Sequence, residues 1–167
     1  EVYRCLKPDA TLFLHCDWHA DAYIRTQILD PIFGTKQLLN VIAWCYNMGG
    51  RSSNCFARKK DTIFWYAKGK QWTICADAIK IPMDSGTKSF GGKLLTDADG
   101  RVYREVFSSK NSKGEKRYYR YYLDEGKVPE DWWIDINSLQ ASHSERCDYP
   151  TQKPEALLER IILASTQ

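Results

Sequence analysis

The stretch YPTQKPEALLERII, residues 149–162, decides how the whole chain is interpreted. Pro154 suits the first turn of a helix, where its fixed φ is helical and its missing N–H has no partner to lose. The apolar residues that follow lie near helical spacing, which predicts an amphipathic helix: Leu157, Leu158, Ile161 and Ile162. Polar groups crowd before it, and the free N–H groups of a helix N-terminus favour an anionic ligand. By itself, the pattern is also that of an ordinary helix entry.

Strand and helix patterns alternate in the first part of the chain. Leu12 to Cys16 is an apolar run that predicts a buried strand, and His19 to Leu29 has helical spacing, closed by Asp30-Pro31 and Gly34. Asn40 to Tyr46 and Thr62 to Ala67 are β-rich and are joined by a polar loop at 47–54. We expect these two runs to form an antiparallel pair at the edge of a parallel sheet.

The character of the chain changes from about Gly69, where helical periodicity disappears. Turn residues at 96–100 and 111–114 flank the alternating runs Arg101 to Phe107 and Lys116 to Leu123, which predicts two hairpins. The α/β pattern returns near the end. The sequence therefore predicts an α/β part at residues 1–69, a β-rich lobe at 70–130 and a return to the α/β part at 131–167.

Composition limits the class of protein. With 167 residues, 43% of them apolar, the chain can build one core, or a core with a lobe. A net charge of +3 is only mildly basic, so any nucleic-acid footprint must be local. The six cysteines form no CxxC pair, which suits a reducing cytosol, and no apolar run approaches the roughly 20 residues needed to cross a bilayer. We expect a cytoplasmic protein.

The stretch at 149–162 resembles the PTQKP element of DNA amino-methyltransferases, in the class whose catalytic motif precedes the cofactor glycine motif. In that family the element lies beside the S-adenosylmethionine pocket, which implies cofactor contacts from Tyr149, Thr151, Gln152 and Lys153. Many relatives have His where Tyr149 stands. His15 and Asp17 end an expected strand, where open α/β sheets bind ligands, and are further candidates; purely local hydrogen bonding is the alternative for both.

The resemblance covers most of the chain. LKPDATLFLHCDWH and DPIFGTKQLLNVIAW resemble the strand after the family's catalytic loop and the helix end and strand that follow, and SSNCFARKKDTIFWYAKG resembles its base-pocket element. The β-rich lobe falls where the family has its target-recognition region. This implies an α/β fold: a partial doubly wound, Rossmann-like methyltransferase sheet with an inserted recognition lobe. Phe56 becomes a candidate for stacking on the target base, whereas Phe64 and Trp65 are expected in the core.

Two family motifs are absent from these residues: the catalytic Asp/Asn-Pro-Pro-aromatic tetrapeptide and the Phe-x-Gly-x-Gly cofactor loop. Asp30-Pro31-Ile32-Phe33 imitates the first but follows a helix pattern, so we assign no catalytic residue to this chain. The family transfers methyl from S-adenosylmethionine to adenine N6 or cytosine N4 of a flipped base, and adenine is favoured here. The isolated chain is predicted to be inactive.

The β-rich lobe contains a local concentration of basic residues, as a nucleic-acid-binding surface would require. Cationic residues alternate with aromatic ones in the lobe, a combination that can hold phosphate and read base edges in double-stranded DNA. The alternative is a solvated amphipathic hairpin. The candidate DNA-binding residues are Arg51, Lys59, Arg101, Arg104, Lys110, Lys113, Lys116, Arg117 and Arg120.

Other interpretations remain open. A non-catalytic DNA-binding or specificity module is the main alternative, and a split enzyme completed by another chain is a third. Possible partners are the missing methyltransferase segments, a homodimer mate or a restriction subunit. Cys16 and His19 with His143 and Cys147 have spacings that a zinc site could use. The family resemblance accounts for both neighbourhoods without metal, so none is expected.

Overall fold

The computed structural model describes residues 1–47, 50–83, 93–147 and 149–166. The chain divides into two compact units. The first comprises residues 1–79 and 130–167, and the second comprises residues 80–129.

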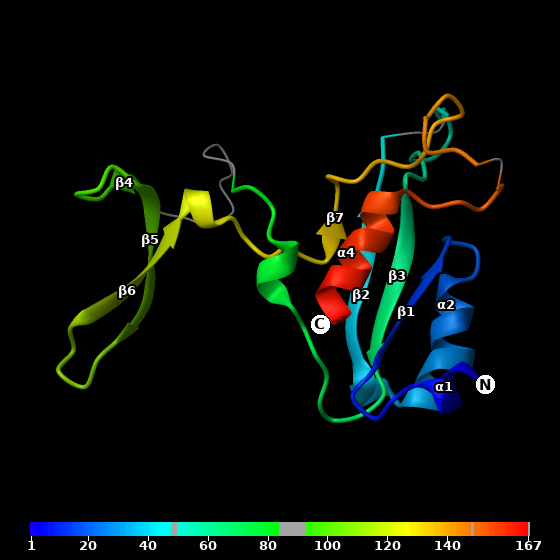
Figure 1. Ribbon diagram of the computed structural model, residues 1–167, viewed down its shortest axis with the longest axis horizontal. Coiled ribbons are helices and arrows are strands. Elements are labelled where there is room, and N and C mark those ends of the chain that lie inside the picture. The colour runs from blue at the N-terminus through cyan, green and yellow to red at the C-terminus, as the bar shows by residue number, and fades with distance from the viewer. Residues whose placement is uncertain (48–49, 84–92, 148, 167) are drawn as a thin grey trace. The chain divides into compact units, whose positions relative to one another are not determined.

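The first unit is built on a four-stranded sheet with the order β1-β3-β2-β7 (Figure 1). Its strands are β1 (Thr11–Cys16), β2 (Leu38–Cys45), β3 (Lys60–Ala67) and the short β7 (Trp132–Trp133). β3 is antiparallel to both β1 and β2, whereas β2 and β7 are parallel. The antiparallel pair is confirmed, but its expected place at the sheet edge is wrong, because β3 lies between β1 and β2. As a consequence, β1 and β2 point the same way.

The apolar run Thr62 to Ala67 explains the central place of β3, because all its residues are buried. A strand covered on both faces needs apolar side chains at successive positions rather than alternate ones. Ile63 and Trp65 enter one core cluster, and Phe64 and Tyr66 enter the other. The prediction that Phe64 and Trp65 lie in the core is confirmed.

A helical segment covers the second cluster. It runs through α2 (Asp21–Tyr23), π-helical turns at Ile24–Leu29 and α3 (Asp30–Phe33), and ends at Gly34, whose φ is 89°. The expected helix is therefore present, but it continues past Asp30-Pro31. Phe33 packs edge-on against Tyr3, with ring centroids 4.9 Å apart, and the Tyr66 hydroxyl donates to Asp30 at 2.6 Å. These contacts attach the end of the helical segment to β3 and to α1 (Val2–Cys5).

Helix α4 (Glu155–Ser165) covers the first cluster. Leu157 and Ala164 are buried and Ile161 packs against the core, whereas Leu158 and Ile162 remain exposed. The apolar face is thus narrower than predicted. Arg160 ties the helix to the sheet, because it pairs with Asp135 and lies 5.1 Å over the Trp133 ring. The remaining helical turns are α1 (Val2–Cys5) and 3₁₀ turns at Thr35–Gln37, Ala76–Ile79 and, in the second unit, Leu123–Glu125.

The second unit is a three-stranded antiparallel sheet with the order β4-β5-β6. Its strands are β4 (Leu94–Thr96), β5 (Val102–Lys110) and β6 (Lys116–Tyr122). Gly100 and Gly114 both have φ 81° in the two connecting turns, a conformation that side chains with a Cβ rarely adopt. Both predicted hairpins are confirmed.

The two adjacent leucines of α4 provide a test of this packing. Leu157 is 1% exposed and Leu158 is 49% exposed. We expect Leu157→Ala to lower the free energy of unfolding by about 2–5 kcal/mol, because it removes buried methyl groups and leaves a cavity. Leu158→Ala, the matched control, should cost less than about 1 kcal/mol. Urea unfolding followed by circular dichroism measures both, and equal losses would contradict the orientation of α4.

Candidate functional site

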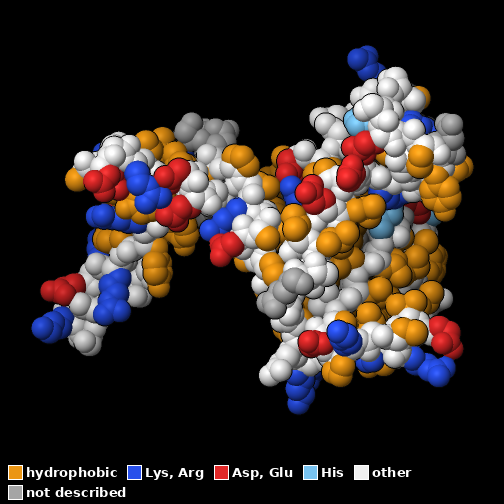
Figure 2. All heavy atoms as spheres, in the orientation of Figure 1, with side chains coloured by type: hydrophobic (Ala, Val, Ile, Leu, Met, Phe, Trp, Pro, Cys, Tyr) orange, Lys and Arg blue, Asp and Glu red, His pale blue; other side chains and the backbone are white. Residues whose placement is uncertain are grey.

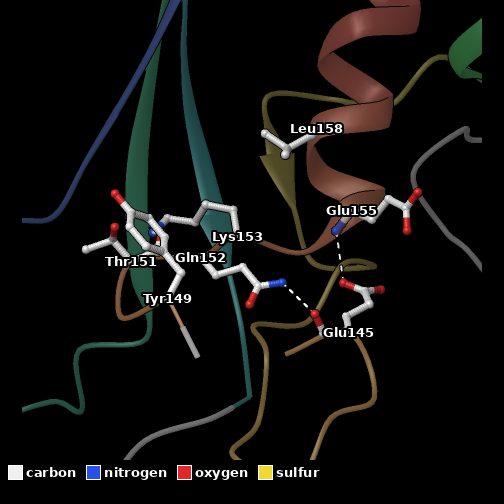
Figure 3. Close-up of a pocket in the computed structure, with 7 residues that line it drawn as sticks. All are labelled: Glu145, Tyr149, Thr151, Gln152, Lys153, Glu155 and Leu158. Carbon is white, nitrogen blue, oxygen red and sulfur yellow. Dashed lines mark hydrogen bonds between the residues drawn. The ribbon is translucent and has the colours of Figure 1, made fainter. Parts of the chain in front are cut away.

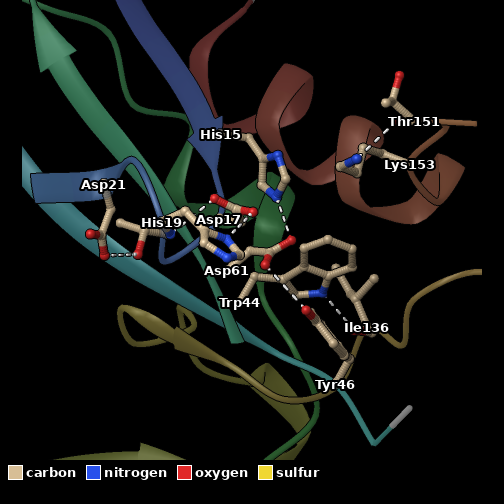
Figure 4. A network of polar contacts seen from close by, with 11 residues as sticks. His15, Asp17, His19, Asp21, Trp44, Tyr46, Asp61, Ile136, Thr151 and Lys153 are labelled. Carbon is tan, nitrogen blue, oxygen red and sulfur yellow. Dashed lines mark hydrogen bonds and ion pairs between the residues drawn. The ribbon is translucent and has the colours of Figure 1, made fainter. Parts of the chain in front are cut away.

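A network of polar side chains forms where β1 and β2 end and β3 begins (Figure 4). His15 Nε2 lies 2.9 Å from Asp61 Oδ2, and the Tyr46 hydroxyl donates to Asp61 Oδ1 at 3.1 Å. The His15 ring packs edge-on against Trp44, which itself donates from Nε1 to the Ile136 carbonyl at 2.7 Å. Because β1 and β2 are parallel to each other, their carboxyl ends bring these side chains together.

The environment of this network keeps its members in defined protonation states. Burial lowers the pKa of His15, the hydrogen bond to Asp61 opposes this, and the positive charge of Lys153 lowers it further. The imidazole is therefore neutral at pH 7 and can donate from Nε2 to Asp61, leaving Nδ1 as an acceptor. Burial, followed by the charge of Asp61, raises the pKa of Tyr46 to about 12, so its hydroxyl remains a donor.

The polar segment before α4 lines a cavity of about 550 Å³ (Figure 3). Its walls come from that segment, the preceding loop and the first turns of α4: Glu145, Tyr149, Thr151, Gln152, Lys153, Glu155 and Leu158. All four residues assigned to the cofactor by resemblance are thus among the lining residues. Figure 4 shows Lys153 at the same end of the sheet as His15, and its positive charge contributes to the lowered pKa of His15.

Hydrogen bonds fix the shape of this segment. Gln152 donates from Nε2 to the Glu145 carbonyl at 2.7 Å and accepts the Cys147 N–H at 3.0 Å. The Glu145 carboxylate accepts the Glu155 N–H at 3.1 Å, so a carboxylate of the chain already occupies part of the helix N-terminus. Lys153 donates from Nζ to the nearby Thr151 carbonyl, at 2.9 Å. Gln152 therefore organises the loop, whereas the Lys153 ammonium group has no acidic partner among the described residues.

Asp17 lies at the same end of the sheet but has local partners. It accepts the His19 N–H at 3.0 Å and contacts His19 Nδ1 at 2.8 Å, and these hydrogen bonds lower its pKa despite some desolvation. The Trp18 and His19 rings pack together with their centroids 3.7 Å apart, and Arg58 Cζ lies 3.8 Å from the centroid of the Trp18 ring. Asp17 thus orders the turn after β1, while His15 takes part in the network.

The loop between β2 and β3 presents the candidate base-stacking residue. The Phe56 side chain is 99% exposed, although burial of a phenylalanine ring against apolar groups is energetically favourable. Arg51 is also exposed, whereas Lys59 is half-buried and donates to the Asn47 carbonyl at 3.1 Å. Positions 48 and 49 of the predicted loop 47–54 lie outside the described residues.

The cationic residues of the second unit differ in their surroundings. Arg101 pairs with Asp124 and Glu125, Arg120 pairs with Glu105, and Arg104 is buried. Those near the β5–β6 turn are exposed: Lys110, Lys113, Lys116 and Arg117. Figure 2 shows that Lys and Arg side chains reach the surface of this unit beside hydrophobic ones.

Sequence reasoning missed Asp61, Tyr46 and Glu145. Asp61 precedes an apolar run and follows two lysines, where a charge is ordinarily solvated. Its signal is the strand register: His15 pairs with Ile63, so Asp61 lies two positions along on the same face. An antiparallel β1–β3 pairing, had it been predicted, would have identified the contact.

Across residues 1–47, 50–83, 93–147 and 149–166, no group of three or more His, Cys, Asp or Glu side chains that could hold a metal ion is found. Cys16 is buried in the helix-covered cluster, and His19 Nδ1 is engaged by Asp17. No helix in the described part of the chain has the length and hydropathy of a membrane span.

Comparison with known proteins identifies the family. A family model described as DNA methylase, of the N6/N4 methyltransferase type, matches residues 1–167. The chain belongs to the N6/N4 DNA methyltransferase family. This match confirms the resemblance to DNA amino-methyltransferases, a family that uses S-adenosylmethionine to methylate DNA.

Several curated relatives of this methyltransferase family align with nearly the entire chain. Type II methyltransferase M.BglII of Bacillus subtilis is 27% identical over 177 residues, covering 100% of this chain and 42% of the relative. M.HpaI of Haemophilus parainfluenzae is 28% identical over 167 residues, covering 99% of this chain and 42% of the relative. The DNA adenine methyltransferase YhdJ of Escherichia coli K12 is 28% identical over 168 residues, covering 99% of this chain and 48% of the relative. The chain thus spans less than half the length of these relatives.

The lowered pKa of His15 predicts how the stability of this methyltransferase chain depends on pH. The unfolded chain protonates His15 near 6.5, whereas the folded chain does so only at lower pH. Folding therefore becomes less favourable as the pH falls below about 6.5, because the unfolded state binds more protons. In His15→Gln this part of the pH dependence should disappear, while losses below pH 4.5, where carboxylates titrate, should remain.

Urea unfolding of both proteins at pH 7.5, 6.5, 5.5 and 4.0 measures this difference. His19→Gln, which alters a histidine in an exposed turn, is the matched control. Parallel stability curves for His15→Gln and the unaltered chain would contradict the proposed environment of His15.

Proposed function

We propose that these residues are part of a site-specific DNA methyltransferase that transfers methyl from S-adenosylmethionine to adenine N6 of an extruded base. The observation that carries the proposal is that His15, its Asp61 partner and the cavity-lining Lys153 lie at one end of the sheet (Figure 4). Ligands of open α/β sheets bind outside the carboxyl ends of the strands. The adenine target is supported by the name of YhdJ, and cytosine N4 is the alternative.

The fold of the first unit and the position of the second unit in the sequence support the same proposal. Helical segments cover both faces of the four-stranded sheet, as expected of a partial doubly wound, Rossmann-like core. The second unit, residues 80–129, would be the target-recognition lobe, with double-stranded DNA as its partner. A protein that modifies DNA in a prokaryote or phage acts in the cytoplasm.

The chemistry of the cavity suits S-adenosylmethionine. A cavity of about 550 Å³ falls in the range typical of small-molecule sites. Lys153 would bind the carboxylate of the cofactor, Thr151 and Tyr149 offer hydroxyl groups, and Leu158 offers an apolar surface. S-adenosylmethionine supplies an electrophilic methyl group when it is bound.

Residues of this chain would orient and enclose the reactants rather than exchange protons with them. The neutral His15 and the protonated Tyr46 hold Asp61 between them, so the end of the sheet presents a fixed polar surface. Phe56 would stack on the extruded base, because an exposed aromatic ring offers a π face to any base. An exocyclic amine is a weak nucleophile, so such positioning supplies much of the rate enhancement.

The 167 residues contain no Asp/Asn-Pro-Pro-aromatic tetrapeptide and no Phe-x-Gly-x-Gly loop. We therefore expect these residues to transfer no methyl group by themselves. Once a polypeptide that carries both elements is added, we expect the mixture to transfer methyl to DNA. Tritiated S-adenosylmethionine and duplex DNA, followed by digestion to nucleosides, measure the product. N6-methyladenine is the expected result. N4-methylcytosine would favour the alternative target, and no product from the mixture would favour the non-catalytic DNA-binding module.

Lys153 provides a test of cofactor binding. We expect Lys153→Met to weaken S-adenosylmethionine binding about tenfold or more, because a hydrogen bond to a charged group contributes roughly 1.5–3 kcal/mol. Lys36→Met is the matched control, since Lys36 is exposed and precedes β2, whereas the network lies beyond the other end of that strand. Equilibrium dialysis in the reconstituted mixture measures both. Equal affinities would remove Lys153 from the cofactor site.

A further inference from the structure

The β5–β6 ribbon of the second unit has two ends with opposite charge balance. The base of the ribbon comprises its paired arginines and their carboxylates, and the tip comprises residues 110–117. Tyr103 pairs with Tyr122 at the base, and Lys110 pairs with Lys116 next to the tip turn. Cationic residues that look alike in the sequence therefore lie in different electrostatic surroundings.

Arginines at the base are engaged within the unit. Arg101 donates to both oxygens of Asp124 at 2.8 Å and to Glu125 at 3.0 Å, and its guanidinium lies 3.9 Å over the Tyr122 ring. Arg120 donates to Glu105 at 3.2 Å and lies 4.8 Å over the Tyr103 ring. A phosphate would have to compete with these carboxylates, so the base gains little from binding a polyanion.

The tip, by contrast, carries uncompensated positive charge. Lys110, Lys113, Lys116 and Arg117 are exposed and form no ion pair with any described residue, although Glu115 is nearby in sequence. Glu115 accepts instead from the Asn111 side chain at 2.7 Å. Lys110 and Lys116 are direct cross-strand partners, and like charges in that arrangement destabilise a sheet. An external anion would relieve this repulsion.

The tip is also held in one conformation. The Asn111 carboxamide oxygen accepts the N–H groups of Lys113 and Glu115 at 3.0 and 2.9 Å, and the backbone N–H of Asn111 donates to the Glu115 carbonyl. A turn ordered in this way loses little backbone entropy when it binds, so its charges are presented in advance.

We propose that the tip of this ribbon binds the phosphate backbone of duplex DNA, while the paired arginines hold the ribbon together. The inference rests on the proposed function and specifies which part of the recognition lobe supplies affinity. Lysines act as point charges toward phosphate and carry no sequence information, so this contact would contribute equally on any sequence. The release of counterions from DNA would make it sensitive to salt.

Two double variants, each of which removes two positive charges, test whether the tip or the base of the ribbon binds DNA. Lys113→Ala/Lys116→Ala should reduce the slope of log affinity against log salt by about 2, and weaken binding on the order of 50-fold at 0.1 M salt. Arg101→Ala/Arg120→Ala should leave that slope unchanged and lower the midpoint of thermal unfolding instead. Fluorescence anisotropy with a labelled duplex, using the full chain, measures the slopes. Equal reductions in both variants would overturn the proposal.

A variant that binds DNA more tightly provides a further test, because a gain of affinity cannot result from misfolding. Glu115→Lys adds positive charge at the tip and should raise the salt slope by about 1. Asp99→Lys makes the same charge change at the exposed β4–β5 turn and should have no effect. An equal gain from both, or none from Glu115→Lys, would contradict a tip contact. Failure of the unaltered chain to bind any duplex would instead count against the proposed function, so the two failures are distinguishable.

Discussion

The burial of β3 on both of its faces is the constraint on which the first unit depends. Ile63 and Trp65 pack toward α4, while Phe64 and Tyr66 pack toward the helical segment 21–33. A strand with two apolar faces must be central, and an antiparallel central strand leaves β1 and β2 parallel to each other. The carboxyl ends of these two strands, which flank β3, therefore lie at the same end of the sheet, and that arrangement creates the candidate site.

The polar network is a consequence of the same geometry. At the start of β3, before its apolar run begins, Asp61 falls on the face that carries His15 and Tyr46. Each oxygen of its carboxylate has a partner, as a half-buried charge requires. Lys153 reaches this end from the segment before α4, whose position is set by Leu157 in the core. Core packing and the site are thus coupled through one short stretch of chain.

The sequence predicted what depends on local pattern. The β-rich runs, the two hairpins and the α4 helix were all identified, because apolar periodicity and turn residues act over a few positions. The place of β3 was mispredicted, although its unbroken apolar run was visible and a central strand has that signature. His15 and Asp17 were proposed together, yet only His15 joins the network, since a side chain's partner depends on strand register rather than on sequence distance.

Charge is where local reasoning reaches its limit. The lobe's arginines and lysines form one basic set in the sequence, but Arg101 meets Asp124 and Glu125 only because the ribbon brings positions more than 20 apart together. A carboxylate within hydrogen-bonding distance changes what a cation can do far more than the net charge of its neighbourhood does. Lys110 and Lys116 come together by the same pairing without such a partner. Strand pairing therefore separates cations that stabilise the fold from cations that remain available to a polyanion.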